Sequence, residues 1–386
     1  MSKKIIVWLN ADITEFGVCY YLQKFAAYEI YAIIDITNKP KHFYETQNLV
    51  KFKQIWFYHD LIKNSTSVES NFLKSFEEKY DIPVKKLAKN DRIFMNKFNE
   101  FYKFSDTEIS NILINECKSF EKIINDVNPD IFLTLETALR PHHFFYLLCK
   151  KKGVKILMLN AANWGDYCYI SEEYHRLNNF KELFENKTSI SAEFGDLQKL
   201  LENNVSSKKH TKFFSVQQKS KISRIKAIIK TLIFSDMSTT KSHYTYYGRT
   251  KFKLIFNEIL IRFKRYSRKK FIDKNFLYEI PDNNKFIFFP LQQEPERSLL
   301  ISTPDYIDQL NTINLILKSL PEDYILVVKE HPTQGPPNRD WRKISDYKSL
   351  LENPKIQLIH PSINAKHIIK KSSLVISVSG TISLES

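Results

Sequence analysis

The sequence predicts an α/β protein with two doubly wound, Rossmann-like parallel sheets, one near each end of the chain. Short apolar runs alternate with segments of helical period in residues 1–177, and the same alternation returns in residues 280–386. Strands that are apolar throughout and joined by helices belong in parallel sheets with both faces covered. Residues 178–279 lose this alternation, so we expect a helical connector between the two domains.

Five strands are expected in the N-terminal domain, because each is a short apolar run bounded by polar residues. They are Ile5–Leu9, Ile30–Ile34, Ile55–Tyr58, Ile131–Leu135 and Val154–Leu159. The clearest helix is Glu108–Asn125, whose apolar residues recur at helical spacing. Ser105 and Glu108 form a capping-box pattern at its start. A second helix is expected at Arg140–Lys152, ended by Gly153.

A second parallel sheet is expected in the C-terminal domain. Its strands are Phe286–Phe289, Tyr324–Lys329, Ile356–Ile359 and Leu374–Val378, with a helix over Asp305–Leu320. Two such domains flanking a helical connector describe the GT-B architecture, whose ligands bind at the carboxyl ends of the strands. The chain stops at Ser386 as a further helix begins, so we expect this domain to be incomplete.

The composition is that of a globular protein, since 43% of the 386 residues are hydrophobic and 26% are charged. No run of about 18 apolar residues is present, so no transmembrane helix is expected. The cysteines are Cys19, Cys117, Cys149 and Cys168. They are scattered without a C-x-x-C spacing, which speaks against zinc and disulfides and favours a reducing cytoplasm.

The formal net charge of +15 is concentrated in one segment. Residues 205–270 hold 18 Lys and Arg against Asp236 and Glu258, a net of +16, so the remainder is nearly neutral. Lys221–Ile233 and Lys251–Lys270 read as basic amphipathic helices. We expect this insert to bind an anionic membrane surface, on the inner face of the cytoplasmic membrane. A solvated helical connector is the alternative.

Three loops of the C-terminal domain follow strands and so point into one cleft: Pro290–Ser298, Lys329–Pro332 and Ser377–Glu385. A helix amino terminus offers free amides and partial positive charge, and hydroxyl groups beside it add donors to phosphate. Donors aimed at a departing nucleotide stabilise the negative charge that it gains. The pattern predicts a site for a nucleotide monophosphate- or diphosphate-linked sugar, and no separate cofactor is expected.

Each of the three loops contributes residues to this predicted site. Lys329 adds positive charge, His331 donates to the leaving phosphate as a catalytic group, and Gly380 lets the backbone approach closely. The full predicted set is Gln293, Glu296, Lys329, His331, Pro332, Ser379, Gly380, Thr381 and Glu385. Each motif alone has a structural explanation as a turn, a helix cap or a solvated loop. Their order and their placement at strand ends favour a functional site.

These motifs resemble a known family. Pro290-Leu-Gln-x-x-Pro-Glu, Val328-Lys-Glu-His-Pro332 and Ser379-Gly-Thr-x-x-x-Glu385 are similar to the C-terminal signature of capsule polysaccharide biosynthesis proteins, which include Kdo transferases. The resemblance implies a cytoplasmic, membrane-associated GT-B glycosyltransferase. The Kdo members use a CMP-linked donor, which their His-Pro and Ser/Thr loops bind. It covers roughly the last hundred residues, and the sugar itself is not carried over.

An inverting transferase also needs a base for the acceptor hydroxyl, which the N-terminal domain usually supplies. Glu136, directly after strand Ile131–Leu135, is the candidate. Arg140, His142 and His143 are candidates for binding an anionic acceptor, a glycolipid or oligosaccharide. The structural alternative is a helix-capping Glu136 with a solvated histidine pair.

Other residues of the N-terminal domain compete for these roles. Asp12 and Glu15 follow the first strand and are further candidates for the base. Asn163–Asp166 offers an aromatic platform for a sugar ring or, alternatively, a turn with a buried tryptophan. No D-x-D carboxylate pair is present, so a catalytic metal is not implied.

The favoured function is a glycosyltransferase of surface polysaccharide synthesis, and three alternatives remain. A nucleotide-sugar 2-epimerase on the same fold shares the donor loops but needs no acceptor. Nucleic-acid binding is suggested by the pI of 9.3 and by Tyr244, Tyr246 and Tyr247 beside cations. No recognised nucleic-acid motif accompanies them, so no nucleic-acid partner is expected. A non-catalytic protein is the last alternative.

Overall fold

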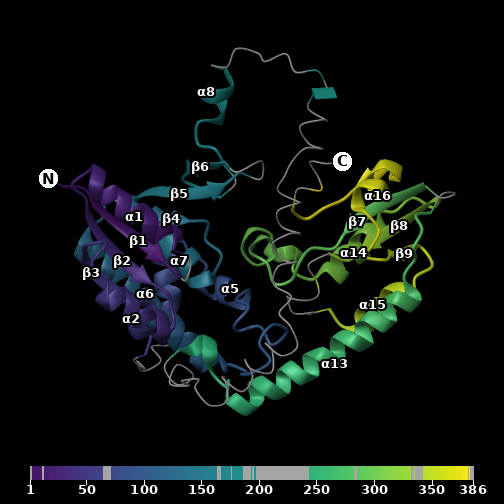
Figure 1. Ribbon diagram of the computed structural model, residues 1–386, viewed down its shortest axis with the longest axis horizontal. Helices are drawn as coiled ribbons and strands as arrows, with labels where there is room; N and C mark the ends of the chain where they lie inside the picture. The colour runs from purple at the N-terminus through teal and green to yellow at the C-terminus, as the bar shows by residue number, and fades with distance from the viewer. Residues whose placement is uncertain are drawn as a thin grey trace. The chain divides into compact units, whose positions relative to one another are not determined.

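The structure is a computed structural model. It describes residues 2–10, 13–63, 71–162, 167–174, 176–185, 193, 195–196, 243–281, 285–331, 334, 342–380 and 382. The chain divides into two compact units (Figure 1). Unit 1 comprises residues 1–206 with 234–250, and unit 2 comprises residues 207–233 with 251–386. The predicted connector is thus shared between the units, because its described residues 178–185, 193, 195–196 and 243–250 belong to unit 1 and 251–279 to unit 2.

Unit 1 is built on a six-stranded sheet within its described residues. The strands are β1 (Lys4–Leu9), β2 (Glu29–Ile34), β3 (Phe52–Phe57), β4 (Ile131–Leu135), β5 (Lys155–Ala161) and β6 (Cys168–Ser171). They run in the order β3-β2-β1-β4-β5-β6, all parallel except β6. This is the strand order of doubly wound nucleotide-binding sheets, whose switch point lies between β1 and β4.

Helices cover both faces of this sheet. They are α1 (Thr14–Phe25), α2 (Asn38–Thr46), α3 (Tyr58–Leu61), α4 (Phe72–Tyr80), α5 (Val84–Lys89), α6 (Asp106–Val127), α7 (Arg140–Lys151) and α8 (Phe180–Glu185). Strand β1 shows why both faces must be covered, because its side chains alternate between two cores. Ile6 and Trp8 pack with α4 to α7, whereas Val7 and Leu9 pack with α1 and α2.

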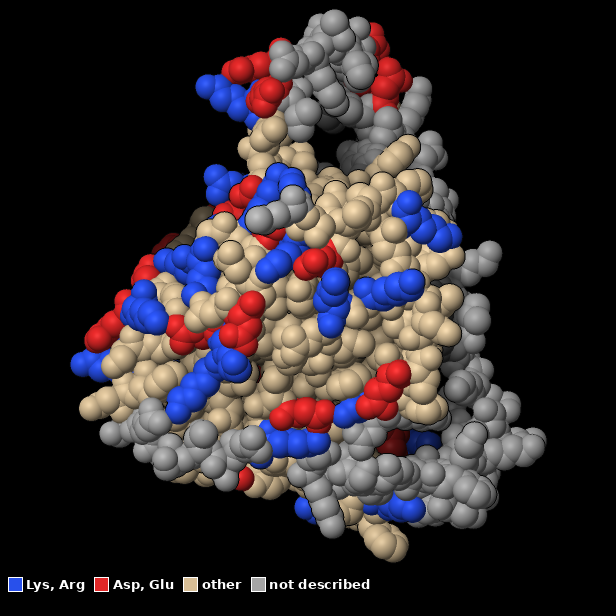
Figure 2. All heavy atoms as spheres, turned by 90° about the vertical axis from the view of Figure 1, so that its left-hand side faces the viewer, with Lys and Arg blue, Asp and Glu red and all other residues tan. Residues whose placement is uncertain are grey.

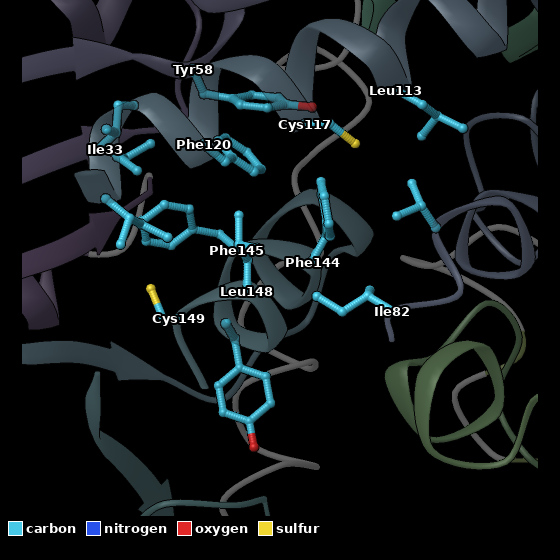
Figure 3. Close-up of a cluster of buried hydrophobic side chains, with 14 of the residues drawn as sticks. Ile33, Tyr58, Ile82, Leu113, Cys117, Phe120, Phe144, Phe145, Leu148 and Cys149 are labelled. Atoms are coloured by element: carbon cyan, nitrogen blue, oxygen red, sulfur yellow. The ribbon is translucent and has the colours of Figure 1, made fainter. Parts of the chain in front are cut away.

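The larger core of unit 1 is rich in aromatic rings (Figure 3). Phe120 of α6 is fully buried, and its ring centroid lies 5.6 Å from Phe144 and 5.1 Å from Phe145, both of α7. Cys117 and Cys149 are buried in the same cluster, where burial raises the pKa of both thiols. The cysteines therefore act here as small apolar side chains.

Unit 2 is built on a four-stranded sheet within its described residues. The strands are β7 (Lys285–Pro290), β8 (Tyr324–Lys329), β9 (Ile356–Ile359) and β10 (Leu374–Val375), in the order β10-β7-β8-β9 and all parallel. The helices are α13 (Lys251–Asn275), α14 (Gln309–Lys318), α15 (Ile344–Leu351) and α16 (Ala365–Lys371). The end of α13 packs with α14 and α15 on one face, and α16 packs on the other. The switch point lies between β7 and β10.

Most predicted elements are confirmed, including strands β1, β2, β4, β7, β8 and β9 and helices α6, α7 and α13. The capping box of α6 is confirmed as well, since Ser105 and Glu108 bond to each other's backbone amides. Gly153, just after α7, has a φ of 75°, a conformation that favours glycine.

Two differences from the prediction lie in unit 2. The helix predicted over Asp305–Leu320 is two elements, a 3-10 turn at Pro304–Tyr306 and α14, because the Asp308 side chain accepts from the amides of Leu310 and Asn311 and starts a new helix. Strand β10 ends at Val375, where the chain turns toward the loop after β7.

The other two differences lie in unit 1. Tyr58 begins helix α3 instead of ending the strand before it. The antiparallel edge strand β6 was not predicted, because it has only four residues and no apolar run. The predicted helix Lys221–Ile233 and the helix after Thr381 lie outside the described residues. Among the helices that the structure describes, none is long and apolar enough to cross a membrane.

Candidate functional site

The carboxyl ends of β7, β8 and β10 lie side by side in unit 2. Pro290 and Lys329, the last residues of β7 and β8, are register partners, and β10 pairs with β7 on its other side. The three predicted loops therefore leave the sheet at one edge, next to the switch point. In doubly wound sheets this edge is where ligands bind.

Gln292 connects the loop after β7 with the loop after β10. Its Nε2 lies 3.4 Å from the hydroxyl oxygen of Ser377, and the Ser379 hydroxyl donates to its Oε1 at 3.2 Å. Gly380 follows with a φ of 104°, a left-handed conformation that L side chains rarely adopt. A β-carbon there would lie 3.7 Å from Gln292 Oε1, an ordinary contact, so the backbone conformation rather than space favours glycine.

Lys329 places a buried amine at this edge. It ends β8 and is only 6% exposed, and burial lowers the pKa of its ammonium group although Glu330 opposes the shift. No ion pair of Lys329 is found within the described part of the chain, because the neighbouring Glu330 carboxylate pairs with Arg342. A buried ammonium group without a carboxylate partner favours an anionic ligand, such as a phosphate.

His331 lies two residues after Lys329 and is half-buried. Its backbone N–H donates to Glu330 Oε1 at 2.8 Å, which orients the loop. Burial lowers the pKa of its imidazole below the usual 6.5, with Lys329 and Arg342 adding to the effect and Glu330 opposing it. The ring is therefore mostly neutral at pH 7 and keeps one N–H donor.

A buried ionic network supports these loops from below. Arg342 binds Glu330 at the end of β8 and, at 2.9 Å, Glu294 in the loop after β7. Tyr347 of α15 donates its hydroxyl to Glu330 Oε2, an oxygen that also accepts from Arg342. Burial alone would raise the pKa of the Glu330 carboxyl, but Arg342 and Tyr347 outweigh burial and lower it. The network thus ties two of the three loops to one guanidinium.

Amide side chains extend this network. Gln309 of α14 accepts from the Gln292 amide at 2.6 Å and donates to Glu294 at 2.6 Å. Gln334 donates to the Glu294 carbonyl, and its own carbonyl accepts from Arg268 of α13 at 2.9 Å. The backbone around Gln292 is therefore fixed from several elements at once.

The remaining predicted donor-site residues are placed differently. Gln293 is half-buried, and Glu296 is exposed and accepts from the Ser298 hydroxyl at 3.1 Å. Pro332, Thr381 and Glu385 lie outside the described residues. The sequence-based choice missed their buried neighbours Gln292, Glu294, Glu330 and Arg342. Gln292, Glu294 and Glu330 could have been found from the sequence, because each lies within two or three residues of a predicted site residue.

In unit 1, Glu136 is exposed directly after β4, on the side of the switch point where the chain leaves the sheet. It lies close to Tyr169 of β6, whose pKa is raised by burial and by the charge of Glu136. The next residue, Thr137, is hydrogen-bonded to His143 Nδ1 at 2.9 Å, which holds the loop to α7. His143 also stacks on Tyr146, one turn further along.

Arg140 and His142 are corrected as candidates for acceptor binding, because both side chains are buried. Arg140 is 6% exposed and binds Glu116 at 2.8 Å and Asp91 at 2.7 Å. His142 lies flat against Trp8, with ring centroids 4.9 Å apart, and its Nε2 is 2.5 Å from the Thr134 hydroxyl. Both residues hold α7 to the core of unit 1.

Tyr244 belongs to the same buried cluster. Its hydroxyl lies 3.0 Å from that of Tyr58 and 3.3 Å from Arg140 Nη2. Because this ring is buried, it is not available to stack on nucleic-acid bases, as the alternative function would require. The contact instead anchors residues 243–250 to unit 1.

Three further candidates for the acceptor side remain. Glu15 of α1 is buried, and Asp12 and the predicted aromatic platform at 163–166 lie outside the described residues. On the face of unit 1 seen in Figure 2, the described acidic and basic side chains are interspersed. The described residues therefore form no large patch of only positive or only negative charge on that face.

Sequence reasoning also missed a histidine pair at the carboxyl edge of unit 1. His59 follows β3, and its Nε2 lies 3.2 Å from Asp35, which follows β2. The ring of His243 lies 4.2 Å from that of His59. Burial lowers the pKa of His243 to about 4, aided by His59 and Lys63 and opposed by Asp60 and Asp35. The strand-end rule that selected Glu136 would have found Asp35 and His59.

Replacement of Arg342 by Met is expected to destabilise unit 2, because Glu330 and Glu294 would stay buried without their cation. We expect a loss of about 3–5 kcal/mol in the free energy of unfolding. Chemical denaturation of the full chain measures it. Lys285→Met, which removes an exposed ion pair with Asp323, is the matched control and should leave unfolding unchanged. Equal effects of the two variants would contradict this account of the network.

The pKa of His243 predicts a loss of stability in acid. Since the folded value of about 4 lies below the ordinary 6.5, the unfolded chain takes up this proton first. Stability is therefore fully present above about pH 6.5 and falls toward pH 4. His243→Asn should have a shallower decline over that window, measured by denaturation at each pH. His42→Asn, at an exposed histidine of unit 1, should keep the wild-type slope.

Comparison with known proteins identifies a family that the chain matches. Residues 191–386 match the family described as capsule polysaccharide biosynthesis protein. Among solved structures, the UDP-GlcNAc 2-epimerase from Methanocaldococcus jannaschii is similar at 12% identity, covering 100% of this chain and 80% of that chain, with a TM-score of 0.25. At that TM-score the likeness carries no argument. No curated protein matches the chain.

Proposed function

The chain belongs to the capsule polysaccharide biosynthesis protein family, and we propose that it is a glycosyltransferase of GT-B architecture. It would transfer a sugar from a CMP- or UDP-linked donor to a glycolipid or oligosaccharide acceptor. Unit 2 would bind the donor, and unit 1 would supply the base. Kdo is one candidate for the sugar.

The observation that supports the donor site is the convergence of donors at one strand edge of unit 2. Lys329 offers a buried amine and His331 a ring N–H, next to the loop that the hydrogen bond from Ser379 to Gln292 holds in place. A nucleotide phosphate matches these groups, because it needs charge and several hydrogen-bond donors together. The buried network around Arg342 keeps the loops in position before the ligand arrives.

The chemistry follows from these positions. Glu136 would take the proton from the acceptor hydroxyl, and the acceptor oxygen would form a bond to the anomeric carbon. The bond from that carbon to the nucleotide phosphate would break, and its electron pair would leave on the phosphate oxygen. Lys329 and His331 would stabilise the charge that develops there. Attack opposite to the leaving group inverts the anomeric centre.

The donor site is tested by nucleotide binding. Thermal shift and calorimetry with CMP, UDP, GDP and ADP should show binding of at least one of them to the wild-type chain. Lys329→Met and His331→Ala should weaken it by about 10- to 100-fold, because each removes a contact to the phosphate. Lys318→Met, an exposed lysine of α14, is the matched control. Binding of no nucleotide at all would exclude the site.

The base is tested separately. Glu136→Gln should abolish transfer and leave nucleotide binding intact, because the amide cannot accept the acceptor proton. Glu172→Gln, an exposed carboxylate elsewhere in unit 1, should retain transfer. Full activity of Glu136→Gln would remove Glu136 as the base. Interconversion of a UDP-sugar without an acceptor would instead identify an epimerase.

A further inference from the structure

Helix α13 exposes a row of large apolar side chains. The six residues of this apolar stripe are Phe252, Phe256, Ile259, Leu260, Phe263 and Tyr266, which are 36% to 81% exposed. Their spacing of three and four residues puts them on one side of the helix, over a length of roughly 20 Å. Contiguous exposed apolar surface of this kind marks a binding face.

The apolar stripe is not part of the face that packs on unit 2. Asn257, Ile261, Arg268 and Ile272 are the buried residues of α13. Arg268 donates to the carbonyl of Gln334, and Ile272 belongs to the core with β7 and β8. At about 100° per residue, the mean direction of these buried positions is about 155° away from that of the stripe. Packing within unit 2 therefore does not account for the apolar side chains of the stripe.

Cations border the apolar stripe on both sides. Arg262 and Lys269 lie along one border, and Lys253 and Lys264 lie along the other, all exposed. The helix as a whole carries nine Lys and Arg against two acidic residues, a net of +7. An aromatic face flanked by cations is the arrangement of helices that lie in the plane of a membrane interface.

We propose that the apolar stripe of α13 docks on a lipid surface with anionic headgroups. Aromatic side chains favour the boundary between headgroups and acyl chains, and the flanking cations are attracted to anionic lipid. The proposal concerns binding alone and does not depend on transferase activity.

Charge and side-chain type favour lipid over other occupants. In a second copy of this chain, the cations bordering one stripe would face the cations bordering the other, which repels. For a nucleic acid, Ile259 and Leu260 at the centre of the stripe offer no ring on which a base can stack. An anionic membrane satisfies both the apolar centre and the charged borders.

The test is sedimentation of the full chain with vesicles. One set is phosphatidylcholine alone, and the other contains about one third phosphatidylglycerol. We expect binding to the anionic vesicles that is at least about tenfold tighter than to the neutral ones, and weaker at high salt. Equal binding to both sets, or binding to neither, would overturn the proposal.

Variants distinguish binding through the apolar stripe from non-specific binding through other exposed apolar residues. A chain with Phe252→Gln, Phe256→Gln and Phe263→Gln should bind anionic vesicles at least about tenfold more weakly. Tyr306→Gln with Leu315→Gln, at exposed apolar positions away from the stripe, should bind as the wild type does. Because all the replaced side chains are exposed, circular dichroism should be unchanged. Undiminished binding of the triple variant would contradict the proposal.

A second readout locates the contact. The chain has four tryptophans of its own, so the wild-type emission is subtracted from that of Phe256→Trp. This difference spectrum should shift to the blue when anionic vesicles are added, because the new ring leaves water. A difference spectrum that does not shift while the chain sediments with vesicles would overturn the proposal. So would a wild-type dimer in solution that the triple variant dissociates, or tighter binding of the stripe to oligonucleotides than to vesicles.

Discussion

The site in unit 2 depends on one buried guanidinium. Arg342 joins Glu330, at the end of β8, to Glu294, in the loop after β7. Burying three charges is costly, and their mutual pairing recovers that cost only with close geometry and extra hydrogen bonds. Tyr347 and Gln309 supply such bonds. The consequence is local rigidity: Glu330 is committed to Arg342, which leaves Lys329 as the cation at the sheet edge.

Unit 1 also contains a buried arginine paired with two carboxylates, but this network lies within its core. Arg140 is buried with Glu116 and Asp91, and it joins α7 to the segment that carries Tyr244. This network lies within the fold and leaves Glu136 exposed at the switch point. In each unit a buried arginine fixes structure while a nearby residue, Glu136 or Lys329, lies at the carboxyl edge of the sheet. A charged residue near a strand end is therefore not by itself a candidate ligand contact, because it can instead be buried in an ionic network such as that of Arg140 or Arg342.

Repeated sequence patterns predicted the strands and helices well, whereas element boundaries that depend on a single side chain were not predicted. Continuous apolar runs predicted the parallel strands, because burial on both faces leaves no polar alternation. The split at Asp308, the short strand β6 and the early end of β10 each depend on one or two hydrogen bonds, which periodicity does not encode. Strand ends selected the edge where we propose that the donor binds, but the sequence did not show which loop residues are buried, and so Gln292 and Glu294 were missed. Arg140 was misplaced for the same reason, since its partners Asp91 and Glu116 are distant in sequence.

The central claim is that a nucleotide binds at the carboxyl edge of the sheet in unit 2. Hydrogen exchange of the full chain, with and without the nucleotide that binds best, tests it most directly. A nucleotide bound there should slow the exchange of backbone amides in the loops after β7, β8 and β10, at residues 291–294, 330–331 and 376–380. Protection confined to unit 1, or to neither unit, would contradict the account.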